Sequence, residues 1–433
     1  MQHAVTLLAR NPAALTDHLS RLPSYLSTSH LLWTLSPHPS LPPNTLNTLT
    51  QTLRHLSPSS IGCLTAPVSL PSPTSSVFTA NPTQPRPTPL ITCSLAFFDP
   101  AEATLFRSAI PGRTEVQVGR SPGARRASAP QAALDPDAGV DWEDVWSRSA
   151  STYALPDELE ALRQRADDVH TVVFFTDNAP QGLMSALSAF PSASKLGLIA
   201  SSTPFITGRP FTLTHNAFIF SSGAVGLALS RPPRPTRVRT AFPGLTALTG
   251  ELTVTRSEGN LIQELDHTNP SRILLTAIQA SASGISGEAA KEHEYYLGVR
   301  AGGSTVQVHH VLSGDPARGT VALASEVAPP AGCVVQLFHG PRTGAPAPTL
   351  PPSLLQGKTK HLSFITASPE PTAAQEAYEG GDEMHVLEHA FLAASENGFL
   401  LGNTGAGAGA EGGEPAQTWT CTVPGGVVSV EWA

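Results

Sequence analysis

Residues 171–199 read TVVFFTDNAPQGLMSALSAFPSASKLGLI, and this stretch decides the fold class. Its first five residues are β-branched or aromatic, which favours a buried strand. Asp177 or Asn178 can cap a helix whose apolar residues recur on one face. Ser194–Ile199 predicts a second strand. The stretch is therefore a strand–helix–strand unit, which builds mixed sheets with helices packed on a face.

The same order of segments occurs earlier in the chain. His30–Leu35 and Ser60–Leu64 are apolar strand candidates. Between them, Asn44 has the place of a helix N-cap, and the leucines after it recur at steps of three and four. The second strand of each unit contains a glycine, Gly62 or Gly197, so we expect a close approach to the backbone there. Packing of a neighbouring element explains such a glycine more simply than a ligand does.

These two units predict a mixed α/β fold of two packed sheet-and-helix modules. The N-terminal module, residues 1–230, contains both units and a flexible insertion over residues 110–150, which is rich in Gly, Pro, Ser, Arg and Ala. The C-terminal module, residues 240–433, is richer in strands and contains a flexible Gly/Ala loop at residues 405–415. The Pro-rich segment 231–235 between them is typical of a linker.

Most of the C-terminal module consists of short apolar runs separated by turn signals. Strands are expected at residues 252–256, 261–265, 295–299, 306–312, 319–324, 334–338, 361–365, 418–422 and 427–430, the last two as a pair. Helices are expected at residues 271–280 and 382–395. In the N-terminal module, a first helix is expected over Asn11–Leu22.

Composition excludes several classes of protein. The formal net charge is −8, and the arginines cluster only in stretches rich in Pro, Gly or Ser, so we expect no nucleic-acid partner. No run of about 18 apolar residues is present, so no membrane span is expected.

The cysteines bear on the compartment of the protein. All four lie far apart and form no CxxC pair, which favours buried free thiols in a reducing compartment. We therefore expect an intracellular, cytoplasmic protein. Residues 1–30 weakly resemble a mitochondrial presequence, so a mitochondrial location stays open as an alternative.

The order of segments resembles the FIST domain family, in which a FIST-N module precedes a FIST-C module. The FIST-N likeness rests on Phe174-Phe175, Leu196–Ser202 and Gly223–Ala228. The FIST-C likeness rests on Val254–Leu265, Tyr296–Gly298, Leu312–Pro316, Gly319 and Phe391–Phe399.

This resemblance implies sensing or recognition in signal transduction, with small molecules such as amino acids proposed as ligands, and it brings no catalytic residues. Some members of the family are eukaryotic F-box proteins that recruit substrates to a ubiquitin ligase. Here about 30 residues precede the first predicted strand, too few for a separate F-box module. A direct role in a ubiquitin ligase is therefore not expected, and a substrate adaptor for protein turnover is an alternative function.

Five polar residues are candidates for a ligand pocket between the modules: Arg256, Asn260, Arg318, Glu396 and Asn397. The arginines could pair with a carboxylate, and the turns around them could offer backbone N–H groups. Simple turn and cap chemistry explains the same residues without a ligand. This interpretation requires no catalytic residue, cofactor or metal.

The string His385-Val-Leu-Glu388-His389 is an HxxEH pattern, the inverted motif of some zinc proteases. On a helix, His385 and His389 would stand one turn apart as two zinc ligands, with Glu388 as the base. The acids that remain downstream as a third ligand are few, and the surrounding sequence follows the FIST-C pattern. A zinc hydrolase is therefore the enzymatic alternative.

Trp142 and Trp146 lie among acids inside the predicted insertion and could anchor a protein partner or the body of the protein itself. No nucleophile elbow, no phosphate-binding loop and no strand-associated GxGxxG is present. The sequence therefore favours a recognition protein over an enzyme.

Overall fold

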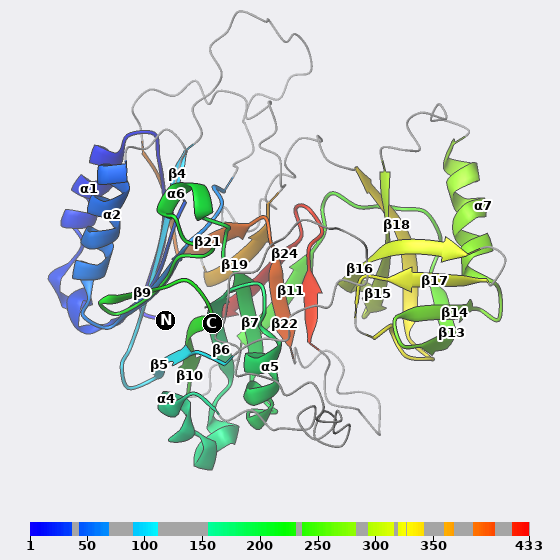
Figure 1. Cartoon of the computed structure of the whole chain (residues 1–433), viewed down its shortest axis with the longest axis horizontal. Coiled ribbons are helices and arrows are strands. Elements are labelled where there is room, and N and C mark those ends of the chain that lie inside the picture. Colours follow the sequence, from blue (N-terminus) through cyan, green and yellow to red (C-terminus); the bar gives the residue numbers. More distant parts are fainter. Residues whose placement is uncertain are drawn as a thin grey trace, which may run out of the picture.

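The computed structural model describes residues 1–36, 43–68, 90–110, 155–230, 236–282, 293–315, 319–325, 327–341, 359–367, 384–402 and 418–432. Helices and many strands in several sheets give the mixed α/β fold that the sequence predicts. Three of the sheets contain four strands in the same relative order and direction, and the fourth sheet closes into a separate barrel (Figure 1).

The first repeat of this plan lies at the N-terminus. Its elements are β1 (His3–Ala9), α1 (Pro12–Ser20), β2 (His30–Leu35), α2 (Pro43–Leu56), β3 (Ser60–Leu64) and β4 (Ile91–Phe98). The strands lie in the order β1-β4-β2-β3, with β2 and β3 parallel and the other neighbours antiparallel. The predicted first helix is confirmed, with Asn11 as its N-cap. Strand β1 has no counterpart among the sequence predictions.

The second repeat has the same order. Its elements are β5 (Ala103–Ser108), α4 (Asp157–Glu160), η2 (Arg163–Asp168), β6 (Thr171–Thr176), α5 (Gln181–Ala186), η3 (Leu187–Ala189), β7 (Ser194–Ile199) and β10 (Ala224–Leu229). The strands lie in the order β5-β10-β6-β7, and again only β6 and β7 are parallel. Both predicted strand–helix–strand units are therefore confirmed.

A third repeat was not expected from the sequence. Its strands are β11 (Thr236–Ala241), β19 (Lys360–Thr366), β21 (Ala390–Ser395) and β24 (Val427–Trp432). They lie in the order β11-β24-β19-β21 with β19 and β21 parallel, so the plan occurs three times.

Two hairpins leave their own repeat and join the sheet of a neighbouring repeat. The hairpin β8 (Leu213–His215) and β9 (Phe218–Phe220) leaves the second repeat and pairs with β3 of the first. Likewise β22 (Phe399–Gly402) and β23 (Trp419–Cys421) leave the third repeat, and β22 pairs with β7 of the second. The residue Ala66, just after β3, forms a bridge with Ala394 in β21. Each repeat is thus joined to the next in a closed cycle.

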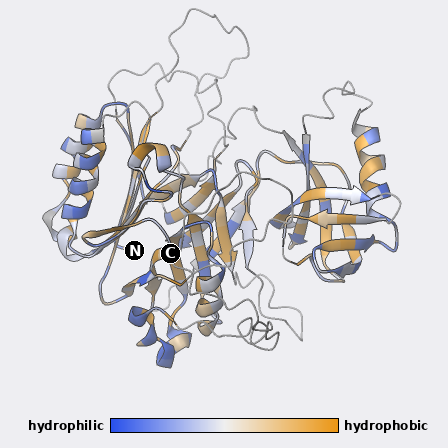
Figure 2. Cartoon of the chain, viewed as in Figure 1, coloured by the Kyte–Doolittle hydropathy of each residue, from blue (hydrophilic) through white to orange (hydrophobic). Residues whose placement is uncertain are grey.

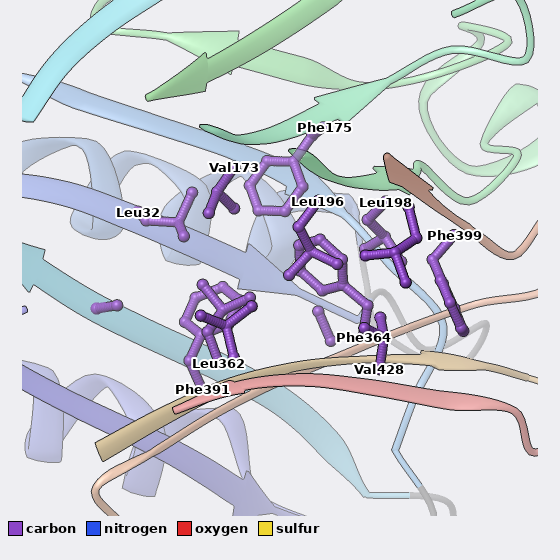
Figure 3. Packing of buried hydrophobic residues seen from close by; sticks show 14 of the residues in the cluster. Leu32, Val173, Phe175, Leu196, Leu198, Leu362, Phe364, Phe391, Phe399 and Val428 are labelled. Carbon is purple, nitrogen blue, oxygen red and sulfur yellow. The ribbon is translucent and has the colours of Figure 1, made fainter. Parts of the chain in front are cut away.

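The inner faces of the three sheets form one apolar core. Leu32 of the first repeat, Phe175 of the second and Phe364 of the third meet there (Figure 3). The outer face of the first sheet packs against α1 and α2, and that of the second against α4 and α5. Figure 2 shows apolar strands inside and mixed helices outside, as burial of one helix face requires.

The strand glycines serve packing, as the sequence predicts. Gly62 pairs with Trp33 across β3 and β2, and a Cβ at Gly62 would overlap the indole ring. Gly197 pairs with Phe174 across β7 and β6, and a Cβ there would overlap the phenyl ring. In both repeats the aromatic ring lies across the glycine of the parallel neighbour.

The barrel follows β11 in the chain. It contains β12 (Thr246–Ala247), β13 (Leu252–Glu258), β14 (Leu261–Leu265), α7 (Pro270–Ala282), β15 (His293–Ala301), β16 (Ser304–Asp315), β17 (Thr320–Leu323) and β18 (Val334–Pro341). Six strands in the order β18-β13-β14-β17-β16-β15 close on themselves through a β18–β15 pairing. An apolar cluster fills the interior, and Leu274 of α7 joins it. The predicted helix and strands of this region are confirmed.

Two predictions for the C-terminal region are wrong. The described part of the predicted helix 382–395, residues 384–395, forms no helix: β20 (His385–Glu388) pairs with β1, and β21 lies buried beside β19. Backbone pairing with distant strands overrides the helical preference of the Ala- and Leu-rich run. Strands β23 and β24 are also not a pair, because they belong to different sheets.

The predicted division of the chain at residues 230–240 separates strands that share sheets. Strand β20 lies beside β1, and β22 lies beside β7. Residues 111–150 of the predicted insertion with Trp142 and Trp146, the segment 231–235 and the loop 405–415 lie outside the described residues. Among the helices that the structure describes, none has the length and apolar character needed to cross a membrane.

Candidate functional site

The candidate site lies where the parallel strands β3, β7 and β21 end. The backbone N–H of Ser201, after β7, donates to Leu64 O of β3 at 3.2 Å. The N–H of Ala66, after β3, donates to Ala394 O of β21 at 2.8 Å. Ala66, Ser201 and Glu396 therefore occupy equivalent positions in the three repeats. Carboxyl ends of parallel strands are common ligand sites, because loops meet there.

Glu396 is the charged residue of this group. Its Oε2 accepts a hydrogen bond from the Ser201 hydroxyl at 2.7 Å, and its Oε1 accepts one from the Ser202 backbone N–H at 2.7 Å. The carboxylate is half-buried, and it forms no ion pair with a cation in the part of the chain that the structure describes. Asn397 Nδ2 also donates to Oε1 at 3.4 Å, and the three donors fix the orientation of the carboxylate while leaving a lone pair free for a further donor.

Asn397 completes the cluster. Its Nδ2 donates to Ala200 O at 2.8 Å, and its backbone N–H donates to the Ser395 hydroxyl at 3.1 Å. The next residue, Gly398, has φ +86°, and a Cβ there would collide with the Cys421 carbonyl. Only glycine fits this turn, so the turn holds both polar side chains against the second repeat. We call Ser201, Ser202, Glu396 and Asn397 the strand-end cluster.

Threonine hydroxyls support the Ser202 side of the cluster. Thr203 Oγ1 lies 2.8 Å from Thr212 Oγ1, and Thr207 Oγ1 lies 2.9 Å from the same atom. Thr203 is the N-cap of α6 (Pro204–Thr207), the short helix that leads to β8, and Thr207 is its last residue. This network fixes the loop that presents Ser202 to Glu396.

Two other predicted pocket residues, Arg256 and Asn260, lie in the barrel. Arg256 of β13 contacts Gln263 and lies 3.5 Å from Glu264 Oε1 on the barrel surface. Asn260, in the β13–β14 turn, donates to Leu323 O at 3.1 Å. Figure 1 shows this hairpin in the barrel, away from β22 in the three-sheet body. Arg318 lies outside the described residues.

The structure therefore brings together Glu396 and Asn397, and it separates them from Arg256 and Asn260. Sequence reasoning missed Ser201 and Ser202 as site residues, although they fall in the FIST-N motif. Their place after the second parallel strand of a repeated unit was the signal that could have found them.

A hollow of about 260 Å³ lies between the body and the barrel. Its lining combines two aromatic rings, one leucine and three hydroxyls: Thr240, Phe242, Leu245, Ser304, Thr305 and Phe338. Thr240 Oγ1 also donates to Thr305 O at 3.1 Å, which ties β11 to β16. No lining residue carries a charge, so the hollow suits an uncharged, partly apolar molecule.

The HxxEH string does not have the geometry of its motif. His385 and Glu388 lie in strand β20, and His389 has φ +63°. Four residues of strand span about 13 Å, too far for two ligands of one tetrahedral zinc. In the described part of the chain, no group of three or more His, Cys, Asp or Glu residues is placed to hold a metal ion.

The cysteines are free thiols, as expected. Burial raises the pKa of Cys93 and of Cys421 to about 12, so both are neutral at physiological pH. A thiol without thiolate character is a poor nucleophile, which argues against cysteine chemistry at these two positions.

Residues 87–268 match the family model of the FIST N domain. The matched part runs from β4 through the second repeat into β14, past the boundary that the sequence predicts at residues 230–240. It includes Ser201 and Ser202 but not Glu396. The FIST domain is linked to sensing in signal transduction. A search of the curated proteins found no match.

Proposed function

We propose that this protein, whose residues 87–268 match the FIST N domain, is an intracellular small-ligand sensor, and that Glu396 anchors the ammonium group of its ligand. The observation that carries this proposal is the half-buried Glu396 carboxylate, oriented by Ser201 and Ser202 and left without a cationic partner in the described chain. Amines and amino acids are the ligand class that this carboxylate suits.

The chemistry of an ammonium group fits the strand-end cluster. An ammonium group has three N–H donors and no acceptor. Glu396 supplies a charged acceptor, and the amide oxygen of Asn397 is a neutral acceptor on the next residue. A charged hydrogen bond in a partly desolvated place is stronger than the same bond in open water.

The position of the cluster also suits sensing. Ser201 and Ser202 belong to the second repeat, whereas Glu396 and Asn397 belong to the third. A ligand bound by both sides stabilises the arrangement in which the two repeats meet. It thereby shifts the population toward that arrangement by its differential affinity.

A thermal-shift screen tests the proposal with ethanolamine, the common amino acids, and acetate as the anionic control. A ligand that binds the native state raises the melting temperature, by an amount set by its concentration relative to Kd. We expect an ammonium compound to raise it, acetate to leave it unchanged, and Glu396→Gln to abolish the rise.

The matched control is Glu264→Gln, which removes a carboxylate from the barrel surface. It should leave the ligand-induced rise intact. A rise that survives in Glu396→Gln, or a screen in which no ammonium compound acts, contradicts the proposal.

The hollow between body and barrel supports a second candidate position, for an uncharged ligand. Its aromatic rings and hydroxyls provide stacking surfaces and hydrogen bonds without a charge. Ser304→Trp would fill it, so a shift produced by a neutral compound should disappear in that variant. The strand conformation of His385–Glu388 argues against the zinc hydrolase, and the metal content of the protein and of His385→Ala tests that alternative.

A further inference from the structure

The hairpins β8–β9 and β22–β23 occupy equivalent places in the first and second sheets. Their strand registers can therefore be matched residue by residue. In the first repeat, Gly62 pairs with Thr214, and Thr214 pairs with Ile219. In the second, Gly197 pairs with Leu400, and Leu400 pairs with Thr420. Because the two glycines are equivalent, β9 corresponds to β23. One position further, Phe218 corresponds to Trp419.

These equivalent aromatic residues have opposite surroundings. The side chain of Trp419 is covered: the residue is 4% exposed, and its Nε1 donates to Val308 O of the barrel strand β16 at 3.0 Å. Its ring also packs edge-to-face against Phe399 and Phe242. Phe218, in contrast, is 67% exposed, and its neighbour Ile219 is 38% exposed. The barrel thus covers the aromatic side chain of one hairpin and leaves the equivalent side chain of the other open.

We propose that β9 is the docking edge for an extended acidic and apolar segment of a partner protein. Strand β9 is the last strand on its side of the seven-stranded sheet in the described chain. An edge strand offers backbone N–H and C=O groups for a further strand, and its exposed apolar side chains offer contacts to alternate residues of that strand.

Three arginines surround β9 and select for acidic side chains. Arg54 donates to Asn216 O and contacts Ala217 O, at the turn before β9. At the other end, the Arg107 guanidinium lies 4.3 Å from the centroid of the Phe220 ring, and Arg209 donates to the Ser221 hydroxyl at 2.9 Å.

The hydrogen bonds that the structure describes for these arginines go to neutral oxygens, so Arg54 and Arg209 keep their charge available to a partner. Burial lowers the pKa of the Arg107 guanidinium, whereas the nearby carboxylates of Asp177 and Glu158 raise it and offset part of its charge. The whole chain carries a net charge of −8, so this basic border is a local feature. Charge of this kind steers and selects partners of opposite sign.

The same charges disfavour another molecule of this chain as the occupant. In a two-fold symmetric β9–β9 pair, the start of one strand faces the end of the other. Arg54 of each molecule would then face Arg107 and Arg209 of the other. Like charges placed opposite each other across a strand pair are destabilising.

A displayed library of random dodecapeptides provides the probe. It is selected against the full-length protein, with counter-selection against Phe218→Ser combined with Ile219→Lys. We expect the selected peptides to alternate apolar and acidic residues. Measured by fluorescence anisotropy, their affinity for the double variant should fall at least tenfold.

A control variant, two arginine variants and a measurement of the melting temperature accompany this experiment. Phe205→Ser removes an exposed aromatic side chain from α6, outside β9, and should leave the affinity unchanged. Arg54→Ala and Arg209→Ala should each weaken binding, and raised salt should do the same. Because the double variant changes only exposed side chains, its melting temperature should equal that of the unchanged protein.

Three results would overturn the proposal. The selected peptides could bind the double variant as tightly as the unchanged protein. Neutral or basic peptides could dominate the selection. Light scattering could show a dimer that the double variant loses, in which case another molecule of this chain covers β9.

Discussion

The strands β23 and β9 occupy equivalent places in two copies of the repeat, but their surroundings differ. Each is the outer strand of a hairpin that belongs to one repeat in the chain and pairs with the sheet of the neighbouring repeat. The barrel contacts β23 through Trp419, which is buried, whereas β9 presents Phe218 to solvent. The barrel is inserted between β11 and β19 of the third repeat, beside only one of the two hairpins. The difference teaches that an insertion can bury the outer strand's aromatic residue in one copy of a repeated fold and leave its equivalent exposed to solvent in another.

The largest expected effect comes from truncating the two equivalent aromatic residues. Trp419→Ala should lower the free energy of unfolding by about 3–5 kcal/mol, because it empties a buried site and leaves Val308 O without its donor. Phe218→Ala should lower it by less than about 0.5 kcal/mol, because the side chain is mostly exposed. Urea unfolding followed by circular dichroism measures both. Equal losses would show that the two edges do not differ as described.

A second effect concerns the barrel strand β16, which covers Trp419. His309 of β16 pairs with Leu297, a residue of the barrel interior, and is 6% exposed. Neither ring nitrogen has a hydrogen-bond partner among the residues that the structure describes, and burial lowers the pKa of His309 to about 4. The pKa of an unfolded histidine is about 6.5, so between these pH values only the unfolded state takes up the proton. Stability should therefore fall as pH falls from 6.5 to 4, by roughly 3 kcal/mol for this residue.

His309→Leu should flatten this pH dependence by a comparable amount. Urea midpoints between pH 7 and pH 4 measure it, and the His55→Gln variant, on the exposed side of α2, is the control. Trp419 fluorescence should report solvent exposure of β23 on acidification, since the barrel strand that contains His309 also covers Trp419. An unchanged pH profile in His309→Leu would contradict the prediction.

The smallest effect tests the packing that makes the two repeats comparable. Gly62→Ala and Gly197→Ala should each lower the free energy of unfolding by about 1–3 kcal/mol, since the new methyl group meets Trp33 or Phe174. Gly250→Ala has open space around it and should change the value by less than about 0.5 kcal/mol. Thermal unfolding compares the three variants. A tolerated Gly62→Ala beside a costly Gly197→Ala would show that the repeats are packed differently.

The candidate site could be predicted only in part. The Glu396–Asn397 pair was accessible from its turn and its family motif. Its partners were not, because the Ser201 hydroxyl bonds a residue 195 positions away. Arg256 and Asn260 were grouped with the pair because sequence contains no measure of distance between modules.

By itself, the sequence determined the local units. Strand periodicity, helix caps and strand glycines specify the two strand–helix–strand repeats and the barrel strands. These signals suffice because each depends on residues that are neighbours along the chain. Only the tertiary structure decided the third repeat, whose strands are interrupted by the barrel, and the conversion of residues 385–395 from a predicted helix to strands. It also decided which hairpin edge is covered. Pairing between distant strands outweighs local preference, because burial and backbone hydrogen bonds are satisfied only when the three sheets close around one core.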